Sequence, residues 1–478
     1  MRARIFAEEN RKWWTLGAVA FGLFMIMLDN TVVNVALPSI QNALRIDRGE
    51  LEWVVNAYAL TFGVLLLTGG KLADLFGRRL IFILGLVIFV ASSLACGLAG
   101  DATTLIAART VQGIGAALMN PATLSIITAP FPPRQRGMAI GIWAGFSAMA
   151  LAIGPLVGGI LTEKVDWSWI FFINVPIGVV GIVAARIFID ESRDTSHEQR
   201  LDLPGLVTSA AGLFALTYAL IATLHHSWTS PLVLSLLGAA AVLLALFVVL
   251  ELRQRIPMLD LSLFRSGTFA GANAVMLLIG LAMFGIFFFN SLFLQNILRY
   301  SAIDTGATFL PMTVLIILVA PAAGKLSDRL GSRWLMSLGM LFVTASLLDF
   351  STLDHGSTFW NILPGLLVGG IGMGLVMTPT TAAAMGSVPV DKAGVGSAVI
   401  NSMRQVGGSL GIAVLGAVVA TQIRPGPPNP EDFVRGYHHA LYVAAAIAFS
   451  GAILAVTTVR KYRHAVEEPE RRPVEAAA

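Results

Sequence analysis

The chain has 478 residues, of which 56% are hydrophobic and only 13% are charged, with a formal net charge of +4. A water-soluble protein of this length would carry roughly a quarter of charged residues, so the excess of apolar side chains excludes an ordinary soluble fold. The single cysteine, Cys96, excludes an intramolecular disulfide.

Apolar stretches of about 20 residues, the length of helix that crosses a bilayer, recur along the whole chain. They predict an all-α polytopic membrane protein, and the alternating pattern of a membrane β-barrel does not occur. In chain order we expect fourteen transmembrane helices, at residues 13–36, 51–70, 80–99, 103–127, 137–161, 168–188, 203–222, 231–250, 268–293, 304–323, 334–350, 358–381, 394–421 and 437–459.

Lysine and arginine residues fall mainly on one side of this predicted topology, by roughly four to one when alternate links are compared. Basic residues gather on the cytoplasmic side of membrane proteins, so we expect both termini in the cytoplasm and residues 460–478 to form a disordered tail there. The bias also explains the basic net charge without nucleic acid as a partner.

The first predicted helix carries an acid, Asp29, within the apolar stretch FMIMLDNTVVNVALPSI (Phe24–Ile40). An ionised carboxylate in hydrocarbon costs several kcal/mol, so such residues usually have a function. Burial raises the pKa of a carboxyl group and a neighbouring guanidinium lowers it, so an acid in this setting can take up and release a proton. The alternative is a structural hydrogen bond within the bundle.

The link after the second predicted helix reads GKLADLFGRR (Gly70–Arg79), in which Gly70 and Gly77 permit a tight turn. Asp74 can accept hydrogen bonds from free amides at a helix N-terminus, and the stretch AGVGS at 393–397 is the expected partner. This contact would latch two halves of the protein together on the cytoplasmic side; the alternative is a plain basic turn. The cations that could pair with Asp74 or with anionic lipid are Arg78 and Arg79.

The fourth predicted helix places a cation, Arg109, within the membrane, with Gln112 on the same face. A membrane arginine usually faces the lumen, a carboxylate or backbone carbonyls. A structural ion pair, or a position nearer the cytoplasmic end, is the alternative to a functional role.

The fifth predicted helix contains Gly154 and Pro155, which predict a kink, followed by Gly158 and Gly159, which permit close approach of a neighbouring helix. We expect this helix to hinge or to seal the lumen. Ordinary packing of small residues is the alternative.

A second copy of the link motif, GKLSDRLGSR (Gly324–Arg333), follows the tenth predicted helix on the same side of the membrane, with Asp328 and Arg333 in matching positions. The repeat predicts two parallel bundles around a central cavity, with a substrate path at their interface, which indicates a transporter. The expected parts are an N-terminal six-helix bundle at 13–188, two linker helices at 203–250 and a C-terminal six-helix bundle at 268–459.

The thirteenth predicted helix carries Arg404 and Gln405, a pair comparable with Arg109 and Gln112, and Arg404 is expected to face either the substrate or the proton path. Aromatic and amide side chains on the helices suit a loose pocket for lipophilic compounds. The candidates for the cavity wall are Asn34, Tyr58, Gln112, Trp143, Phe146, Phe287, Asn290 and Gln405.

Four stretches resemble signatures of the major facilitator superfamily, in its fourteen-helix drug/proton antiporter branch (EmrB/QacA-type). They are LDNTVVNVALPSI, GKLADLFGRR, RTVQGIGAAL and GIWAGFSAMALAIGPLVGG. The resemblance covers nearly the whole chain and implies that Asp29 serves cation recognition or proton coupling and that Arg109 tunes proton release. Two residues depart from the family pattern: Leu75 replaces a basic residue of the link motif, and Ala150 replaces a glycine of the antiporter motif.

No phosphate-binding loop, enzyme signature or metal-ligand cluster occurs in the sequence, so we expect no catalytic activity and no cofactor. We therefore expect a proton-driven exporter of hydrophobic or cationic drugs in the inner (plasma) membrane, with substrate, protons and lipid as partners. Whether a periplasmic adaptor protein is also a partner, as in some relatives, is left open by the sequence. The alternatives are an exporter of one native metabolite, antibiotic or lipid, an uptake symporter, and a membrane sensor or scaffold that transports nothing.

Overall fold

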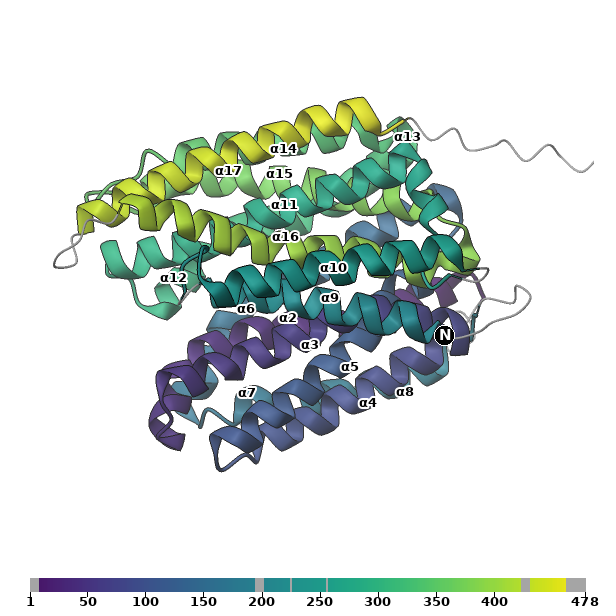
Figure 1. The fold of residues 1–478 in the computed structure, drawn as a ribbon, viewed down its shortest axis with the longest axis horizontal. Helices are drawn as coiled ribbons and strands as arrows, with labels where there is room; N and C mark the ends of the chain where they lie inside the picture. Colours follow the sequence, from purple (N-terminus) through teal and green to yellow (C-terminus); the bar gives the residue numbers. More distant parts are fainter. Residues whose placement is uncertain (1–7, 194–201, 224–225, 255–256, 423–429, 461–478) are drawn as a thin grey trace, which may run out of the picture.

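The computed structural model describes residues 8–193, 202–223, 226–254, 257–422 and 430–460. In this part of the chain long helices lie side by side, and short turns join them (Figure 1). The predicted disordered tail at 460–478 lies, after its first residue, outside the described residues.

The first third of the chain forms one group of packed helices, drawn in purple and blue in Figure 1. In it α5 packs against α3 and α4, and α2 packs against α6 and α8. Its elements are α2 (Glu8–Leu44), α3 (Arg48–Phe76), α4 (Arg78–Gly97), α5 (Ala102–Thr128), α6 (Pro133–Lys164), α7 (Trp169–Phe172) and α8 (Asn174–Phe188). We call this group the first bundle.

The last part of the chain forms a second group with corresponding contacts, which we call the second bundle. Its elements are α11 (Gly267–Leu292), the π-helix η2 (Phe293–Ile297), α12 (Ala302–Thr308), α13 (Leu310–Leu330), α14 (Ser332–Phe350), α15 (Phe359–Gly386), the 3₁₀-helix η3 (Val390–Lys392), α16 (Ala393–Gln422) and α17 (Pro430–Thr458). The two bundles meet chiefly where α6 packs on α13 and α3 packs on α16.

Two further helices, α9 (Leu203–Ala222) and α10 (Pro231–Arg253), lie between the bundles in sequence and pack on each other. In space α9 contacts α3 of the first bundle and α16 of the second (Figure 1). The 3₁₀-helix η1 (Leu261–Arg265) leads from them into α11, and beside it Asp260 forms an ion pair with Lys392, which lies just before α16.

Twelve helices of the described part are long and apolar enough to cross a membrane. The remaining long helices, α5 and α6, have 27 and 32 residues and are not among these twelve. Every residue of α5 from Gly115 to Thr128 is buried, so this stretch meets protein on all sides and needs no apolar surface for lipid. Hydropathy therefore supports twelve of the fourteen predicted spans, and the count of fourteen stays a prediction.

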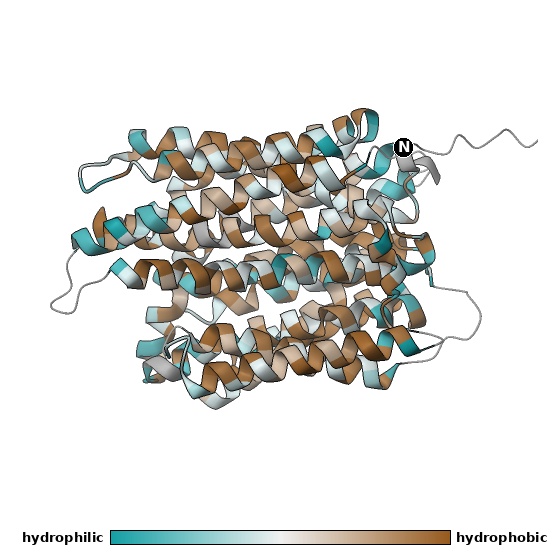
Figure 2. Ribbon diagram, turned by 45° about the horizontal axis from the view of Figure 1, so that its top comes forward, coloured by the Kyte–Doolittle hydropathy of each residue, from teal (hydrophilic) through white to brown (hydrophobic). Residues whose placement is uncertain are grey.

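In a soluble protein the most apolar helices are the most buried, and here the reverse is seen. The most apolar of the twelve helices, α10, has only 17% of its apolar stretch buried, and it exposes Val242 and Leu252. Hydrophobic residues line the middle of the helices, while hydrophilic residues gather toward their two ends (Figure 2). This distribution fits a polytopic membrane protein whose outer surface meets hydrocarbon.

Several predicted boundaries need correction. The first helix continues to Leu44, past Pro38, and the last begins at Pro430 rather than near residue 437. The sixth predicted helix is divided at Ile173, and the tenth is divided at Phe309 into the short helix α12 and the longer α13. Hydropathy marks only the apolar part of a helix, so polar turns that extend beyond the membrane are missed.

Candidate functional site

A buried ion pair lies inside the first bundle. Asp29 on α2 has no exposed surface, and its Oδ2 lies 2.5 Å from Nη1 of Arg109 on α5, which is 1% exposed. Gln112, one turn after Arg109, donates from Nε2 to Oδ1 of Asp29 at 2.9 Å. The structure thus brings Asp29 together with two residues that the sequence places on one face of the fourth predicted helix.

A second layer of polar groups holds this pair in place. Ser93 on α4 accepts hydrogen bonds from Gln112 and from Asn174 on α8, both at 2.9 Å. Asn174 also donates to Oδ1 of Asp29 at 3.4 Å. Sequence reasoning missed Ser93 and Asn174; the available signal was a polar residue inside the apolar stretches ASSLAC and FFINVPIG.

Arg109 is bound on several sides. Its Nε donates to the carbonyl of Val54 on α3 at 3.0 Å, and its Nη1 also donates to Oε1 of Gln112 at 2.7 Å. The guanidinium carbon lies 4.3 Å from the ring centre of Tyr58, a cation–π contact. Helices α2, α3, α4, α5 and α8 therefore all contribute to one polar network around Asp29, which we call the acid network.

The chemistry of the acid network follows from its burial. Each charge compensates the other, so removal of one partner alone leaves an uncompensated charge and costs about 3–5 kcal/mol. Protonation of Asp29 would dissolve the ion pair and leave Arg109 with neutral partners. Since neither side chain of the pair has appreciable exposure, proton exchange with bulk water requires the surrounding helices to move.

One end of the molecule holds the contact predicted for the link motif. Asp74, near the end of α3, accepts hydrogen bonds from the backbone amides of Gly394 and Val395 at the start of α16, both at 2.9 Å. These amides lack partners within their own helix, and the positive end of the helix dipole favours the carboxylate. Arg78 pairs with Asp74 at 2.9 Å and donates to the carbonyl of Val390 at 2.5 Å.

The repeat of the motif makes the reciprocal contact. Asp328 on α13 accepts hydrogen bonds from the amides of Gly137 and Met138 at the start of α6, at 3.0 and 3.3 Å. Each bundle therefore caps a helix of the other with an aspartate. We call this end, defined by Asp74 and Asp328, the latch end.

Glycines permit the close approach at the latch end. A Cβ atom on Gly70 would lie 2.5 Å from the carbonyl oxygen of Gly394, so any side chain there would push α3 away from α16. Gly77 has a φ of +116°, a backbone conformation that side chains strongly disfavour. After this turn Arg79 donates to the carbonyl of Ile189 at 3.2 Å, and Arg333 lies over the ring of Trp334 at 5.2 Å.

The glycines of α6 bring this helix against both bundles. A Cβ atom on Gly154 would lie 1.8 Å from Oγ1 of Thr31 on α2, two residues from Asp29, and Gly158 packs on the backbone of Val32. Toward the second bundle, Gly159 faces Ile303. The helix is continuous through Pro155, whose side chain lies outside the description.

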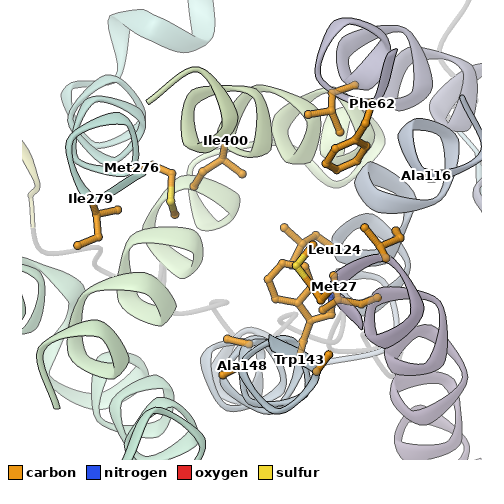
Figure 3. Close-up of a cluster of buried hydrophobic side chains, with 14 of the residues drawn as sticks. Met27, Phe62, Ala116, Leu124, Trp143, Ala148, Met276, Ile279 and Ile400 are labelled. Carbon is orange, nitrogen blue, oxygen red and sulfur yellow. The ribbon is translucent and has the colours of Figure 1, made fainter. Parts of the chain in front are cut away.

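A small cavity lies between the bundles, and Arg404 of α16 is part of its wall. Of the predicted wall residues only Trp143 lines it, and Figure 3 shows Trp143 and Leu124 from the first bundle with Met276 and Ile400 from the second. The full lining is Leu124, Trp143, Ala144, Met276, Met377, Thr381, Ile400, Asn401 and Arg404.

The other predicted wall residues lie elsewhere. Tyr58 and Gln112 belong to the acid network, and Asn290 lines a second small cavity, where Tyr437 donates to it at 2.5 Å. Phe287 packs on Phe309 with ring centres 5.0 Å apart. The rest are spread over the bundles: Asn34 and Phe146 are exposed, and Gln405 is half-buried beside Gly63.

Comparisons with known proteins agree with this architecture. Residues 19–412 match the family profile described as Major Facilitator Superfamily. The chain is 36% identical over 420 residues to the "Tetracenomycin C resistance and export protein" of Streptomyces glaucescens, covering 87% of this chain and 77% of that protein. It is 37% identical over 407 residues to the "Multidrug resistance protein Stp" of Mycobacterium tuberculosis (strain CDC 1551 / Oshkosh), covering 85% and 75% respectively.

Among solved structures, the human organic anion transporter MFSD10 (TETRAN) superposes with a TM-score of 0.70. The superposition covers 93% of this chain and 99% of that chain at 13% sequence identity. At this identity the likeness concerns the fold alone.

Proposed function

The chain belongs to the Major Facilitator Superfamily, and from this premise we propose that it exports amphipathic organic compounds from the cell in exchange for protons. The family is one of transporters rather than enzymes, and relatives of this chain are named for antibiotic or multidrug resistance and export. These names support outward transport as the direction.

The proposal includes a fourteen-helix topology in the plasma membrane, as in the drug/proton antiporter branch. Both α5, with 27 residues, and α6, with 32, are long enough to cross a hydrocarbon core of about 30 Å at about 1.5 Å per residue. With all fourteen helices spanning, both termini and the latch end face the cytoplasm, as the distribution of basic residues favours.

The observation that carries the proposal is the acid network. In an outward-facing state Asp29 takes up a proton and releases Arg109; in an inward-facing state the proton leaves and the ion pair forms again. Because the pair joins α2 to α5, each protonation change alters which helices are held together, and this links proton movement to the conformation of the bundle.

The contacts at the latch end close one side of the molecule, as an alternating-access mechanism requires. In the described conformation Asp74 and Asp328 hold the bundles together there, so a compound from the cytoplasm enters only after these caps separate. Helix α6 contacts α2 beside Asp29 and also α13 of the second bundle. It is therefore placed to transmit a change at the acid network to the interface, as the antiporter motif implies.

Transport in proteoliposomes tests the proposal. Purified protein is reconstituted with the dye pyranine inside, a pH gradient is imposed, and transport of ethidium, 1-naphthaleneacetate and 1-naphthaleneacetamide is followed with the accompanying proton movement. Wild type should transport at least one of them in a manner that nigericin abolishes, while Asp29→Asn should lose the response to the gradient.

Full gradient-driven transport by Asp29→Asn would overturn the coupling role of Asp29. A protein that moves no compound of a broad panel under any gradient would favour the sensor or scaffold alternative. Transport of a single compound class would favour a dedicated exporter, a reading that the name of the Streptomyces glaucescens relative supports.

A further inference from the structure

The central cavity is bounded by five helices, α5 and α6 from the first bundle and α11, α15 and α16 from the second. Its wall is mostly apolar, with Leu124 and Trp143 on one side and Met276 and Ile400 on the other (Figure 3), and Met377 also lines it. In the described conformation the enclosed space is small, so binding of an organic compound requires the two bundles to separate around it.

Most polar groups of this wall already donate within the protein. The indole N–H of Trp143 donates to Thr123 at 3.1 Å, and the amide nitrogen of Asn401 donates to the carbonyl of Ser397 at 2.9 Å. The hydroxyl of Thr381 donates to the carbonyl of Met377 at 2.9 Å. Asn401 and Thr381 therefore offer their oxygens as acceptors, and neither carries a negative charge that would select a cation over a neutral donor.

Arg404 is different. It is the one charged residue among the described side chains that line the cavity, and it is 9% exposed. Its guanidinium has no hydrogen bond or ion pair with any residue in the described part of the chain, and no described carboxylate lies within 4.0 Å. A buried cation without a partner is unfavourable, so this site gains most from a ligand that brings a negative charge.

We propose that the central cavity binds amphipathic organic anions, and that Arg404 recognises their carboxylate or phenolate group. The planar guanidinium forms two parallel hydrogen bonds with a carboxylate, while Trp143, Met276 and Met377 pack against the aromatic body. The inference rests on the proposed export function and specifies its substrate class. It differs from the expectation of cationic cargo, since the acid that would attract a cation, Asp29, is already paired with Arg109.

Three ligands of nearly identical shape test this inference: 1-naphthaleneacetate, its amide and 1-naphthylmethylamine carry a negative, a neutral and a positive group. Their equilibrium binding to the full-length protein in nanodiscs is measured by calorimetry without any gradient. A pair of charge-assisted hydrogen bonds predicts that the acetate binds at least about tenfold more tightly than the amide, and the amine most weakly. Equal binding of acetate and amide, or preferred binding of the amine, overturns the inference.

Substitutions of single residues test whether Arg404 causes the preference for the acetate over the amide. Arg404→Met should bring acetate binding down to the level of the amide and leave amide binding within about twofold, whereas Arg404→Lys should keep part of the preference. Arg186→Met, an exposed arginine on α8, removes the same charge away from the cavity and serves as the matched control. A preference that survives in Arg404→Met assigns the anion to another site and overturns the role of Arg404.

Separate measurements of binding and of transport distinguish the proposed anion site from the proposed export function. If the acetate is preferred in binding but no compound is exported, the anion site stands and the export function fails. If ethidium is exported with protons while the acetate binds no better than the amide, the export function stands and the anion site fails. Thermal unfolding of each variant confirms that the binding data come from folded protein.

Discussion

Away from the latch end, each bundle has a buried arginine among its described residues, Arg109 in the first and Arg404 in the second, and the surroundings of the two differ. Arg109 of the first bundle has a carboxylate, an amide oxygen, a backbone carbonyl and an aromatic ring around it. Arg404 of the second bundle has no such partner among the described residues and borders a cavity. A buried charge that has its partners stabilises one arrangement of the helices. A buried charge without partners instead favours the binding of a ligand of opposite charge.

The largest difference should appear when each arginine is replaced by methionine. Arg109→Met leaves Asp29 buried without its counter-ion and should lower the free energy of unfolding by about 3–5 kcal/mol. Arg404→Met removes a charge that has no partner in the described part of the chain, so stability should stay equal to wild type or rise. Thermal unfolding followed by tryptophan fluorescence measures both variants side by side.

Cys96, which is fully buried beside Gln112, adds a local reporter for the same experiment, because a thiol-reactive dye labels it only when the first bundle opens. The double variant Asp29→Asn/Arg109→Gln removes both charges and should recover much of the lost stability. Equal destabilisation by Arg109→Met and Arg404→Met would contradict the distinction between the two arginines.

The reciprocal caps at the latch end allow a second comparison of the bundles. Asp74 accepts hydrogen bonds from its two backbone amides at 2.9 Å, whereas Asp328 accepts from its two amides at 3.0 and 3.3 Å. Asp74→Asn should therefore raise access to the central cavity more than Asp328→Asn, by about tenfold or more. The rate at which a membrane-impermeant thiol reagent labels Leu124→Cys, in a Cys96→Ala background, measures this access.

In that experiment the reagent is added from the latch side, and addition from the opposite side is the control. A larger increase for Asp328→Asn than for Asp74→Asn would reverse the predicted ranking. No increase in either variant would show that the caps do not close the latch end.

The packing of α6 on the first bundle predicts a smaller effect. Gly154→Ala brings a methyl group into the position of the Thr31 hydroxyl and should destabilise the protein by about 1–3 kcal/mol and slow transport. Thr31→Ala removes the hydroxyl that the new methyl group would meet. The double variant Gly154→Ala/Thr31→Ala should therefore recover most of the stability and transport rate lost in Gly154→Ala, as measured by thermal unfolding and by transport assays. Failure of the second substitution to rescue the first would mean that Gly154 acts through something other than this contact.

The smallest effect should come from the ion pair between Asp260 and Lys392. Burial by itself would raise the pKa of Asp260, but hydrogen bonds from Ser262 and Lys392 outweigh it and lower the pKa from 3.8 to about 2. Because the pKa is lowered in the folded state, the contact stabilises the protein above pH 4 and is lost as the pH falls toward 2.

Asp260→Asn should thus cost less than about 1 kcal/mol, because the pair is partly exposed. The difference in melting temperature from wild type should be the same at every pH between 5 and 8. A difference that grows with pH within this range would indicate that another titrating group controls the contact.

The sequence predicted the parts of this protein that depend on local pattern. The helix at residues 203–222 was located at both ends, since a proline and a cluster of polar residues bound an apolar stretch. The partner of Asp74 was predicted as well, because the motif and the glycine-rich start of α16 both carry distinctive residues. Helix α5, expected at residues 103–127 and found at Ala102–Thr128, was also located, although it is not among the twelve helices whose hydropathy marks them as candidate membrane spans.

The remaining members of the site could not be predicted in this way. Ser93 and Asn174 are common residues far apart in the chain, and only the packing of α4 and α8 brings them to Asp29. Likewise, no residue near Arg404 in sequence shows that it lacks a partner among the described residues, because this depends on where the acids lie in the folded chain. Long-range packing therefore decides which buried polar groups are satisfied.

The two caps at the latch end also have a consequence for affinity measurements. If each favours the closed arrangement by roughly 1.5 kcal/mol, only about one molecule in a hundred is open toward that side. A compound that arrives from there then binds with an apparent Kd about a hundredfold weaker than the intrinsic value. A variant with a weakened cap would consequently look like a transporter of higher affinity, although no residue of its binding site had changed.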